Sequence, residues 1–537
     1  MTHPYLALDS ASFLLPDSRL LLSGLTEQFD TRHTGLVGRN GVGKSVLARL
    51  LAGELAPSSG RVLRAGRVCY LSQQVEHIGV GTVASLAGVQ PVLGALARID
   101  AGSIAEADFE LVGDRWDLPA RLHHALEQAG LGHIDAATPA ARLSGGEAMR
   151  VALLGAMLSE ADFLILDEPT NHLDAPSRAA LGAQLRQWKR GLLVVSHDRA
   201  LLAQMERIVE LSPQGLRSYG GNYAFYTEAR ALEQGSAVRE LDHARQALQR
   251  EDRAMREQRE RQQRRQAQGA REGKSANQAR ILLGRQKERS ENSSGRLRQR
   301  HDEARQQQQQ RVRDAAQGVR EDSTIRLHAT AVAAAAQRRV AELEDVELPF
   351  AAPPFNRLSL VVTGQMRLGV TGPNGSGKST LLKVIAGELA PLAGDASRDP
   401  ACAWLDQGLA TLDPQRSTIA QLLEVNRSTG QDRLRTYLAQ LGLDAQKVAL
   451  PAGLLSGGER LKAALACALY ADPPARLLLL DEPGNHLDLA SNEALEAMLN
   501  AYAGALVVVS HDEVFLERIG LTHRLEAGRA GWRLRLL

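Results

Sequence analysis

Cysteine is scarce in this chain, which has only Cys69, Cys402 and Cys467 among its 537 residues. Three scattered cysteines cannot supply a disulfide framework, a CxxC zinc site or an iron–sulfur cluster, and they fit a reducing compartment. Long apolar runs are also missing, since none approaches the ~20 residues that a membrane helix needs. The first residues, MTHPYLALDSAS, have no basic start before an apolar stretch. We therefore expect a soluble, cytoplasmic protein without a membrane partner.

Aromatic residues make up only 4% of the chain, and none occurs between Tyr226 and Phe350. Within that stretch, residues 229–326 hold 24 Lys and Arg against 15 Asp and Glu, a net charge of +9 in a chain whose total is +2. Such a Gln-rich, charged segment cannot build a core of its own. The composition predicts a globular domain at 1–228, a basic helical linker at 229–321 and a second globular domain at 322–537.

The two predicted globular domains share four segments in the same order. GRNGVGKS at 38–45 returns as GPNGSGKS at 372–379, and LSGGE at 143–147 returns at 455–459. LILDEPTNHLD at 164–174 returns as LLLDEPGNHLD at 478–488, and LLVVSHD at 192–198 returns as LVVVSHD at 506–512. An ordered repeat of this kind indicates two copies of one fold.

The first shared segment has the pattern GxxxxGK[ST], which binds phosphate when it joins a strand to a helix. An apolar run precedes each copy, and apolar residues at helical spacing follow it. Backbone N–H groups of the loop and the helix N-terminus would hold the phosphates, while the lysine reaches the β- and γ-phosphates and the serine ligates Mg²⁺. The residues expected to bind ATP here are Gly38, Asn40, Gly41, Gly43, Lys44 and Ser45, and Gly372, Asn374, Gly375, Gly377, Lys378, Ser379 and Thr380.

The third and fourth shared segments are apolar strands that end in polar residues. Adjacent acids at a strand end point to different sides, so they can take different roles. We expect Asp167 and Asp481 to bind Mg²⁺, and Glu168 and Glu482 to polarise an attacking water as general bases. His197 and His511 follow the other strand and are expected to reach the γ-phosphate.

The LSGGE segment places a serine and two glycines before a helix, which makes a second anion site. We expect Ser144, Gly145 and Gly146 to grip the γ-phosphate of a nucleotide bound to the second copy. Ser456, Gly457 and Gly458 would do the same for the first copy.

With these motifs in both halves, the chain resembles the ATP-binding cassette superfamily. The resemblance implies that Gln73 and Gln407 belong to the Q-loop, which contacts nucleotide and Mg²⁺, and that Asp174 and Asp488 belong to the D-loop, which couples the two sites. Gly484 departs from the first copy, which has Thr170 at the matching position beside the acid pair. Phe13 and Phe350 are candidates for stacking on adenine, although a core aromatic is an equal reading.

Two cassettes on one chain, the NHLD segments and the charged linker resemble the ABC-F group of that superfamily. This resemblance implies an ATP hydrolase that binds the ribosome, with the linker near the tRNA and peptidyl-transferase region, and that protects the ribosome from antibiotics in some members. The gap from Gln73 to Ser144 exceeds the gap from Gln407 to Ser456 by 22 residues (71 against 49). These extra residues correspond to a short version of the ABC-F arm.

The linker sequence predicts two helices around a tip, as in a coiled-coil hairpin. Ala237, Leu241, Ala244, Leu248 and Met255 form a thin apolar seam at three- and four-residue spacing. Glycines break the pattern near 266–300, and this stretch contains nine basic and three acidic residues. Six of these basic residues are expected to contact rRNA or tRNA phosphates: Arg271, Lys274, Arg280, Arg285, Lys287 and Arg289.

Other readings of the whole chain remain open at this point. The nucleotide-binding subunit of a transporter with separate membrane subunits would have both cassettes, but it would leave the basic linker without a use. A solvated spacer would explain the charge of the linker without RNA. Pairing of the two cassettes within one chain predicts a monomer.

Overall fold

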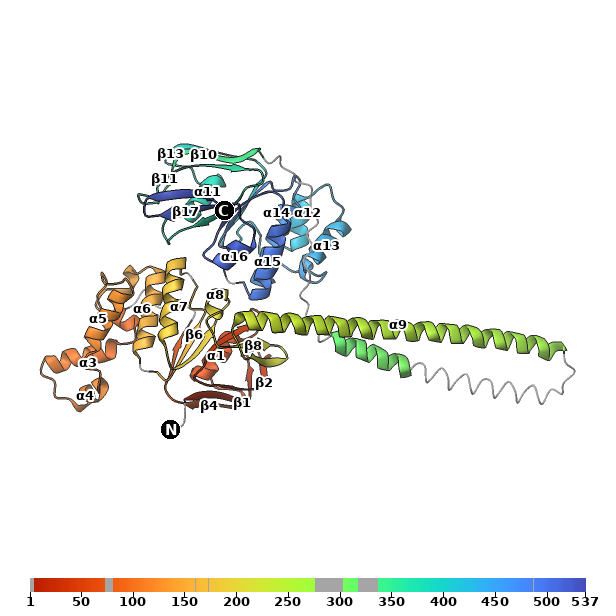
Figure 1. Cartoon of the computed structure of the whole chain (residues 1–537), viewed down its shortest axis with the longest axis horizontal. Coiled ribbons are helices and arrows are strands. Elements are labelled where there is room, and N and C mark those ends of the chain that lie inside the picture. The colour runs from red at the N-terminus through yellow and green to blue at the C-terminus, as the bar shows by residue number, and fades with distance from the viewer. Residues whose placement is uncertain are drawn as a thin grey trace. The chain divides into compact units, whose positions relative to one another are not determined.

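The computed structural model describes residues 4–72, 81–159, 161–171, 173–275, 303–316, 337–485 and 487–537. It separates one compact unit, Met1–Ala224 with Ser323–Leu537, from a second unit, Phe225–Asp322. The first unit holds two α/β halves of the same plan, which we call the first and second cassette. The predicted fold class, two phosphate-loop α/β domains with a helical region between them, is confirmed (Figure 1).

The first cassette combines a three-stranded antiparallel sheet, ordered β2-β1-β4, with a six-stranded sheet, ordered β5-β6-β7-β3-β8-β9. The six-stranded sheet is parallel except for its β8–β9 pair. The strands are β1 (Tyr5–Leu14), β2 (Leu20–Phe29), β3 (His33–Gly38), β4 (Ser59–Ala65), β5 (Val68–Leu71), β6 (Phe163–Asp167), β7 (Gly191–Val195), β8 (Arg207–Ser212) and β9 (Gly215–Tyr219). The helices are α1 (Lys44–Ala52), α2 (Val83–Leu86), α3 (Gln90–Asp100), α4 (Glu106–Val112), α5 (Leu118–Gln128), α6 (Gly145–Leu158), α7 (Ala175–Gln187) and α8 (Arg199–Leu202), with a 3₁₀ turn at Ala140–Arg142.

The second cassette repeats both sheets, with strand orders β11-β10-β13 and β14-β15-β16-β12-β17-β18. Its strands are β10 (Arg339–Glu347), β11 (Arg357–Thr363), β12 (Arg367–Thr371), β13 (Ala393–Arg398), β14 (Cys402–Leu405), β15 (Leu477–Asp481), β16 (Ala505–Val509), β17 (His523–Gly528) and β18 (Gly531–Leu536). Its helices are α11 (Lys378–Ile385), α12 (Thr418–Val425), α13 (Gln431–Gln440), α14 (Gly457–Leu469), α15 (Leu489–Ala501) and α16 (Glu513–Arg518), with 3₁₀ turns at Lys447–Ala449 and Ala452–Leu454.

The apolar strands of each cassette are buried on both faces of the sheet. In β15, Leu477 and Leu479 pack into the core that includes α11, whereas Leu478 and Leu480 pack into the core that includes α14 and α15. Successive side chains of a strand point to opposite faces, so a strand covered on both faces must be apolar throughout. This explains why LLLL and FLIL run without alternation.

The strand order brings the shared motifs to one edge of the sheet. In the first cassette β3 lies between β7 and β8, and β7 lies between β6 and β3. Because these strands are parallel, their carboxyl ends meet at the same edge, which is where such sheets bind ligands. The phosphate loop, Asp167 and His197 therefore converge although they are far apart in sequence.

The helical regions of the two cassettes differ in size. Between α2 and α5 the first cassette contains α3 and α4, whereas in the second cassette α13 follows α12 after a short connection. The extra residues expected from the sequence therefore form a pair of helices that pack on each other.

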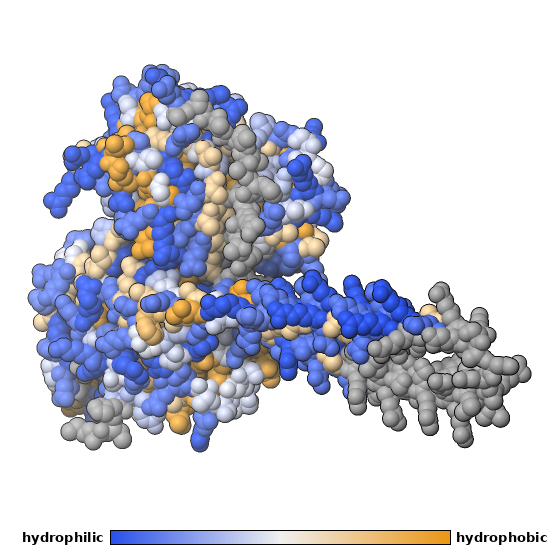
Figure 2. Space-filling view, turned by 45° about the vertical axis from the view of Figure 1, so that its right-hand side comes forward, coloured by the Kyte–Doolittle hydropathy of each residue, from blue (hydrophilic) through white to orange (hydrophobic). Residues whose placement is uncertain are grey.

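The second unit is dominated by α9 (Tyr223–Ser275), a helix of 53 residues (Figure 1). At 1.5 Å per residue it extends over about 80 Å. Its surface is largely hydrophilic (Figure 2), but all five predicted seam residues are buried or half-buried.

Residues 303–316 form another helix, and Arg305 Nε lies 3.5 Å from Asp252 Oδ1 of α9. Most of the expected tip lies outside the described residues, including four of its six named basic residues: Arg280, Arg285, Lys287 and Arg289. No helix in the described ranges is long and apolar enough to cross a membrane.

Gly155 in α6 provides a test of how α2 packs on α6. A Cβ at Gly155 would overlap the backbone carbonyl of Ala87 at the end of α2, whereas a Cβ at Gly94 in α3 would meet only the end of the Arg98 side chain at 3.4 Å. Helix propensity alone predicts that Gly→Ala stabilises either helix by about 0.5–1 kcal/mol. We expect Gly155→Ala to lower the melting temperature, because overpacking costs about 1–3 kcal/mol, and Gly94→Ala to leave it equal or higher. The opposite order in thermal unfolding would contradict the packing of α2 on α6.

Candidate active site

The first phosphate loop turns from β3 into α1 through backbone that favours glycine. Gly43 precedes the helix with φ 105°, in the left-handed region. Lys44 begins α1 and is 8% exposed, and its ammonium donates hydrogen bonds to the carbonyls of Gly38 at 2.8 Å and Arg39 at 3.1 Å. The loop thus holds a cation against its own backbone, facing the space that a phosphate would fill.

The second phosphate loop has the same geometry. Lys378 begins α11, is 7% exposed and donates to the carbonyls of Gly372 and Pro373, both at 2.9 Å. Burial lowers the pKa of both Lys44 and Lys378, and nearby carboxylates oppose that change. Both loops are therefore built alike around one buried lysine.

Each of the paired acids at the end of β6 and β15 has its own direction. Asp167 and Asp481 are the last residues of their strands, and both are buried. Glu168 and Glu482 follow with φ 50° and 48°, in a region that non-glycine residues seldom adopt. Backbone in such a conformation costs about 1–3 kcal/mol and is concentrated at functional sites. The turn separates each glutamate from the aspartate before it, as the sequence predicted.

Asp167 has an oxygen available for a cation. Burial raises its pKa, while the Ser45 and Tyr70 hydroxyls oppose the rise. Tyr70 Oη donates to Asp167 Oδ2 at 3.2 Å, and Oδ1 is buried without a hydrogen-bond partner among the described residues. Sequence analysis missed Tyr70, and Trp404 occupies the matching position of the second cassette. A hard oxygen donor beside a serine hydroxyl suits Mg²⁺.

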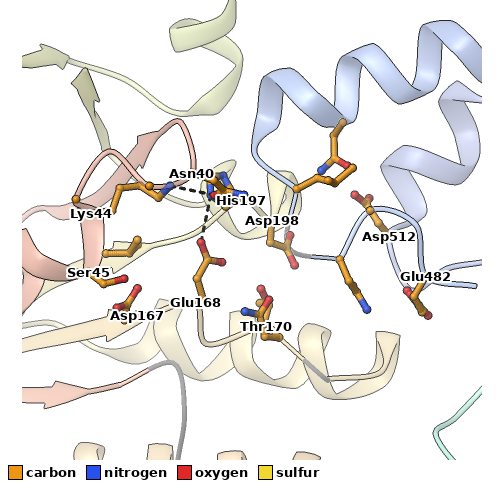
Figure 3. A pocket seen from close by; sticks show the side chains of 18 of the residues that line it. Asn40, Lys44, Ser45, Asp167, Glu168, Thr170, His197, Asp198, Glu482 and Asp512 are labelled. Atoms are coloured by element: carbon orange, nitrogen blue, oxygen red, sulfur yellow. Dashed lines mark hydrogen bonds and ion pairs between the residues drawn. The ribbon is translucent and has the colours of Figure 1, made fainter. Parts of the chain in front are cut away.

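Each histidine bridges a phosphate-loop asparagine and the glutamate of the same cassette. His197 Nε2 lies 3.1 Å from Asn40 Oδ1 and 3.4 Å from Glu168 Oε1 (Figure 3). His511 Nε2 lies 3.2 Å from the Asn374 side-chain oxygen and 3.5 Å from Glu482 Oε1. The contact joins the ends of three neighbouring strands into one cluster.

The protonation of these groups suits proton transfer. Burial lowers the pKa of His197 to about 3 and of His511 to about 4, with help from the nearby lysines, so both rings are neutral at pH 7. Burial raises the pKa of Glu168, which Lys44 opposes, and raises the pKa of Glu482 to about 7. A carboxylate with a pKa near the working pH is suited to act as a general base.

The D-loops connect the two cassettes. Asp174 caps α7 by accepting the N–H of Ser177 at 3.1 Å, and its other oxygen accepts the N–H of Asn374 at 3.3 Å. Asp488 likewise caps α15 through Ser491 at 2.8 Å and accepts the N–H of Asn40 at 3.0 Å.

Asp174 and Asp488 each make one hydrogen bond within their own cassette and one to the opposite cassette. Each caps its own helix and holds the phosphate loop of the other cassette, and the pKa of each lies below its usual range because such hydrogen bonds outweigh burial. The described contacts thus make each site depend on both cassettes.

A buried ion pair also crosses between the cassettes. Arg199 of the first cassette is paired with Glu496 of the second, and they are 3% and 6% exposed. Arg518 Nη1 lies 3.4 Å from the other oxygen of Glu496. The positions that match this pair by repeat carry Glu513 and Gly182, so the pairing is not repeated there.

The LSGGE serines cap the helices that follow them. Ser144 Oγ donates to Glu147 Oε2 at 2.8 Å and accepts the Glu147 N–H at 3.3 Å, and Ser456 forms the same capping box with Glu459. Among the described residues that line the two cavities below, neither serine appears. Their expected contact with a nucleotide stays a prediction.

Two cavities contain most of the predicted residues. The first, of about 500 Å³, is lined by Asn40, Gly41, Gly43, Lys44, Ser45, Asp167, Glu168 and His197 from the prediction (Figure 3). The second, of about 360 Å³, is lined by Asn374, Gly375, Gly377, Lys378, Ser379, Thr380, Gln407, Asp481, Glu482 and His511. Gln73 lies outside the described residues. The phosphate-loop, acid-pair and histidine motifs therefore meet in two places, whereas the LSGGE segments line neither cavity among the described residues.

The cavities also show where the aromatic candidates lie. Phe350 lines the second cavity and is 92% exposed, so its face is available. Phe13 packs against the core of the first cassette, and Leu15 and Leu21 line the first cavity instead. The apolar surface beside the first phosphate loop is thus aliphatic, which the search for aromatic residues missed.

Comparison with known proteins places these features in one family. The ABC transporter family matches residues 29–171 and 355–485, and so matches the chain twice. In structure, the archaeal ribosome recycling factor aABCE1, solved in complex with the archaeal ribosomal stalk protein aP1, has a TM-score of 0.60 at 19% identity, over 98% of this chain and 89% of its own. At that identity the likeness concerns the fold alone.

Curated relatives match over nearly the whole chain. The tylosin resistance ATP-binding protein TlrC of Streptomyces fradiae is 32% identical over 95% of this chain and 97% of its own length. The ribosome protection protein VmlR of Bacillus subtilis is 29% identical over 90% and 80%. ABC transporter F family member 5 of Arabidopsis thaliana is 28% identical over 90% and 69%. With its two nucleotide-binding cassettes, this chain belongs to the ABC-F group of the ATP-binding cassette superfamily and is an ATP hydrolase.

Proposed function

We propose that this ABC-F ATPase binds the ribosome in its ATP-bound state and acts on translation through its linker. One combination of features carries the proposal. The two cassettes contact each other's phosphate loops, and a long basic helix lies between them in the sequence. One relative is named a ribosome protection protein and another a tylosin resistance protein, so antibiotic resistance by ribosome protection is one form that the function would take.

Within this proposal, each ATP site is composite. Lys44 and Lys378 bind the β- and γ-phosphates, and Glu168 and Glu482 accept a proton from the attacking water. His197 and His511 orient the γ-phosphate, since each already touches the glutamate of its site. The LSGGE segment of the opposite cassette completes each site on closure.

Mg²⁺ would be held by Ser45 with Asp167, and by Ser379 with Asp481. The described residues contain no cluster of three His, Cys, Asp or Glu side chains around a metal position. This fits a Mg²⁺ ion that takes its remaining ligands from phosphates and water. Bound there, the ion would offset charge that develops on the phosphates.

The linker would provide the contact with rRNA or tRNA. Exposed arginines line α9, among them Arg245, Arg250, Arg253, Arg256 and Arg264. Arginine contacts RNA phosphates without reading sequence, and no aromatic residue of the linker beyond Tyr226 is available to stack on bases. The tip residues named from the sequence would extend this basic surface.

We also propose the division into 1–228, 229–321 and 322–537. A single chain carries both halves of each site, so the protein would act as a monomer, and work on ribosomes places it in the cytoplasm. The ATP-binding subunit of a transporter is the alternative, and in that case α9 would have no part in the activity.

The glutamates provide the first test. Glu168→Gln with Glu482→Gln removes both bases and keeps the shape of the site, so ATP hydrolysis should fall by about 10²–10⁴ while ATP binding persists. The matched control is Glu54→Gln with Glu388→Gln, a repeat-related pair after α1 and α11 that lines neither cavity described above. Turnover near the wild-type rate in the first double variant would refute the roles of both glutamates.

The same double variant tests the partner. With ATP it should cosediment with ribosomes, and with ADP it should not, because only ATP has the γ-phosphate that both cassettes can grip. Cosedimentation with membranes, and not with ribosomes, would support the transporter subunit instead.

Charge in the linker gives a further prediction. Replacing the six named basic tip residues by Gln should leave basal ATP hydrolysis nearly intact and weaken ribosome binding. The dependence of that binding on salt should become shallower, because fewer counterions are released. Replacing Glu272, Glu288 and Glu291 by Gln is the control of opposite sign and should strengthen binding. An unchanged affinity and salt dependence in the first variant would mean that the linker is a spacer.

A further inference from the structure

The two D-loop helices begin alike and then differ in charge. Four residues after the capping aspartate, the first cassette has Arg178 and the second has Asn492. The residue that follows the glutamate and proline differs as well, with Thr170 in the first cassette and Gly484 in the second. The border between the cassettes is therefore cationic on one side and neutral on the other at matching positions.

Arg178 is held by its own cassette close to the opposite one. Its Nε donates to the carbonyl of Leu173 at 3.0 Å, and Nη1 lies 3.5 Å from Asp198 Oδ2. The side chain is only 18% exposed. A hydrogen bond to the residue before the Asp174 cap and an ion pair with the N-cap of α8 thus fix where its charge lies.

That charge acts on the second site. Arg178, Glu482 and Asn485 all line both cavities, so the guanidinium and the glutamate of the opposite cassette face the same space. Figure 3 shows Asp198 of the first cassette and Glu482 of the second along this cavity. The positive charge of Arg178 also lowers the pKa of Glu482 against the effect of burial, and lowers the pKa of His511.

Asn492 cannot do the same for the first site. It is 6% exposed, and its Oδ1 is buried without a hydrogen-bond partner among the described residues. That oxygen lies 3.2 Å from where a Cβ on Gly484 would be, so the short amide is packed against its own cassette. Glu168 has Lys44 as its nearby cation and receives no charge from this position.

Asp198 ties Arg178 to the first site. It directly follows His197, and its Oδ1 caps α8 through the N–H of Leu201 at 3.0 Å, which leaves Oδ2 for Arg178. Asp512 caps α16 in the same way through Phe515 at 3.0 Å, but the matching position facing it carries Asn492. Asp198 and Arg178 of the first cassette thus connect the loop of His197 with Glu482 of the second cassette. The second cassette has no arginine at the position that would connect its histidine loop with Glu168.

We propose that Arg178 is a positioning residue in trans, which is held by Asp198 beside the first site and orients Glu482 in the second. Hydrolysis at the second site then depends on the first cassette through this contact, and hydrolysis at the first site has no matching dependence. The inference rests on the proposed role of Glu482 as a base.

The test separates the two sites by inactivating one at a time. Arg178→Asn, which introduces the residue of the other cassette, is made in Glu168→Gln, where only the second site turns over, and in Glu482→Gln, where only the first does. We expect kcat to fall at least about tenfold more in the Glu168→Gln background, since a correctly placed general base contributes about 10²–10⁴-fold, with little change in KM. Arg178→Lys should recover part of the loss, and Asp198→Asn should reproduce it in the same background.

Arg186→Asn is the matched control, because this other arginine of α7 donates to Gln204 Oε1 at 2.8 Å and lines neither cavity, and it should affect neither background. Equal losses in both backgrounds, or no loss, would overturn the inference while leaving the proposed function intact. Turnover near the wild-type rate in the double variant Glu168→Gln with Glu482→Gln would instead refute the proposed function. Melting temperatures of Arg178→Lys and Asp198→Asn distinguish a kinetic effect from misfolding, because a loss of kcat that follows stability alone also overturns the inference.

Discussion

Two aspartates at the starts of helices determine how this protein can work. Asp174 and Asp488 each use one carboxylate oxygen on their own helix and the other on the phosphate loop of the opposite cassette. A capping aspartate is fixed by its helix, so the loop that it holds is placed relative to that helix. Movement of one cassette relative to the other would therefore change the surroundings of both phosphate loops.

Around this symmetric pair of contacts, the halves have become different. Tyr70 donates a hydrogen bond to Asp167 where the second cassette has Trp404, and Arg178 lines a cavity with Glu482 where the matching position has Asn492. The differences surround the residues that contact phosphate in the proposed mechanism and do not include them. The proposed catalytic groups are thus repeated in both cassettes, whereas their neighbours are not.

Sequence predicted the groups within each cassette because parallel strands bring their ends to one edge. Lys44, Asp167, Glu168 and His197 needed only the strand order to meet, and the fold class followed from the repeat itself. The contacts between cassettes could not be predicted, because Arg178 lies outside the shared segments and a helix cap looks the same whether or not its second oxygen is used. The sequence shows that Gly484 replaces the threonine of the first copy, but it does not show that Asn492 lies beside Gly484. The positions of Gln73 and of most of the basic tip lie outside the described residues and stay predictions.

The buried pair of Arg199 and Glu496 has a consequence for the ancestry of the chain. A protein assembled from two copies of the first half would place Arg199 opposite Gly182, and two second halves would place Glu496 opposite Glu513. Two first halves would leave Arg199 buried without its partner, at a cost of about 3–5 kcal/mol. Two second halves would set Glu496, which keeps Arg518, against the like charge of Glu513. The ion pair therefore favours contact between unlike halves, and their fusion in one chain keeps the two unlike halves together.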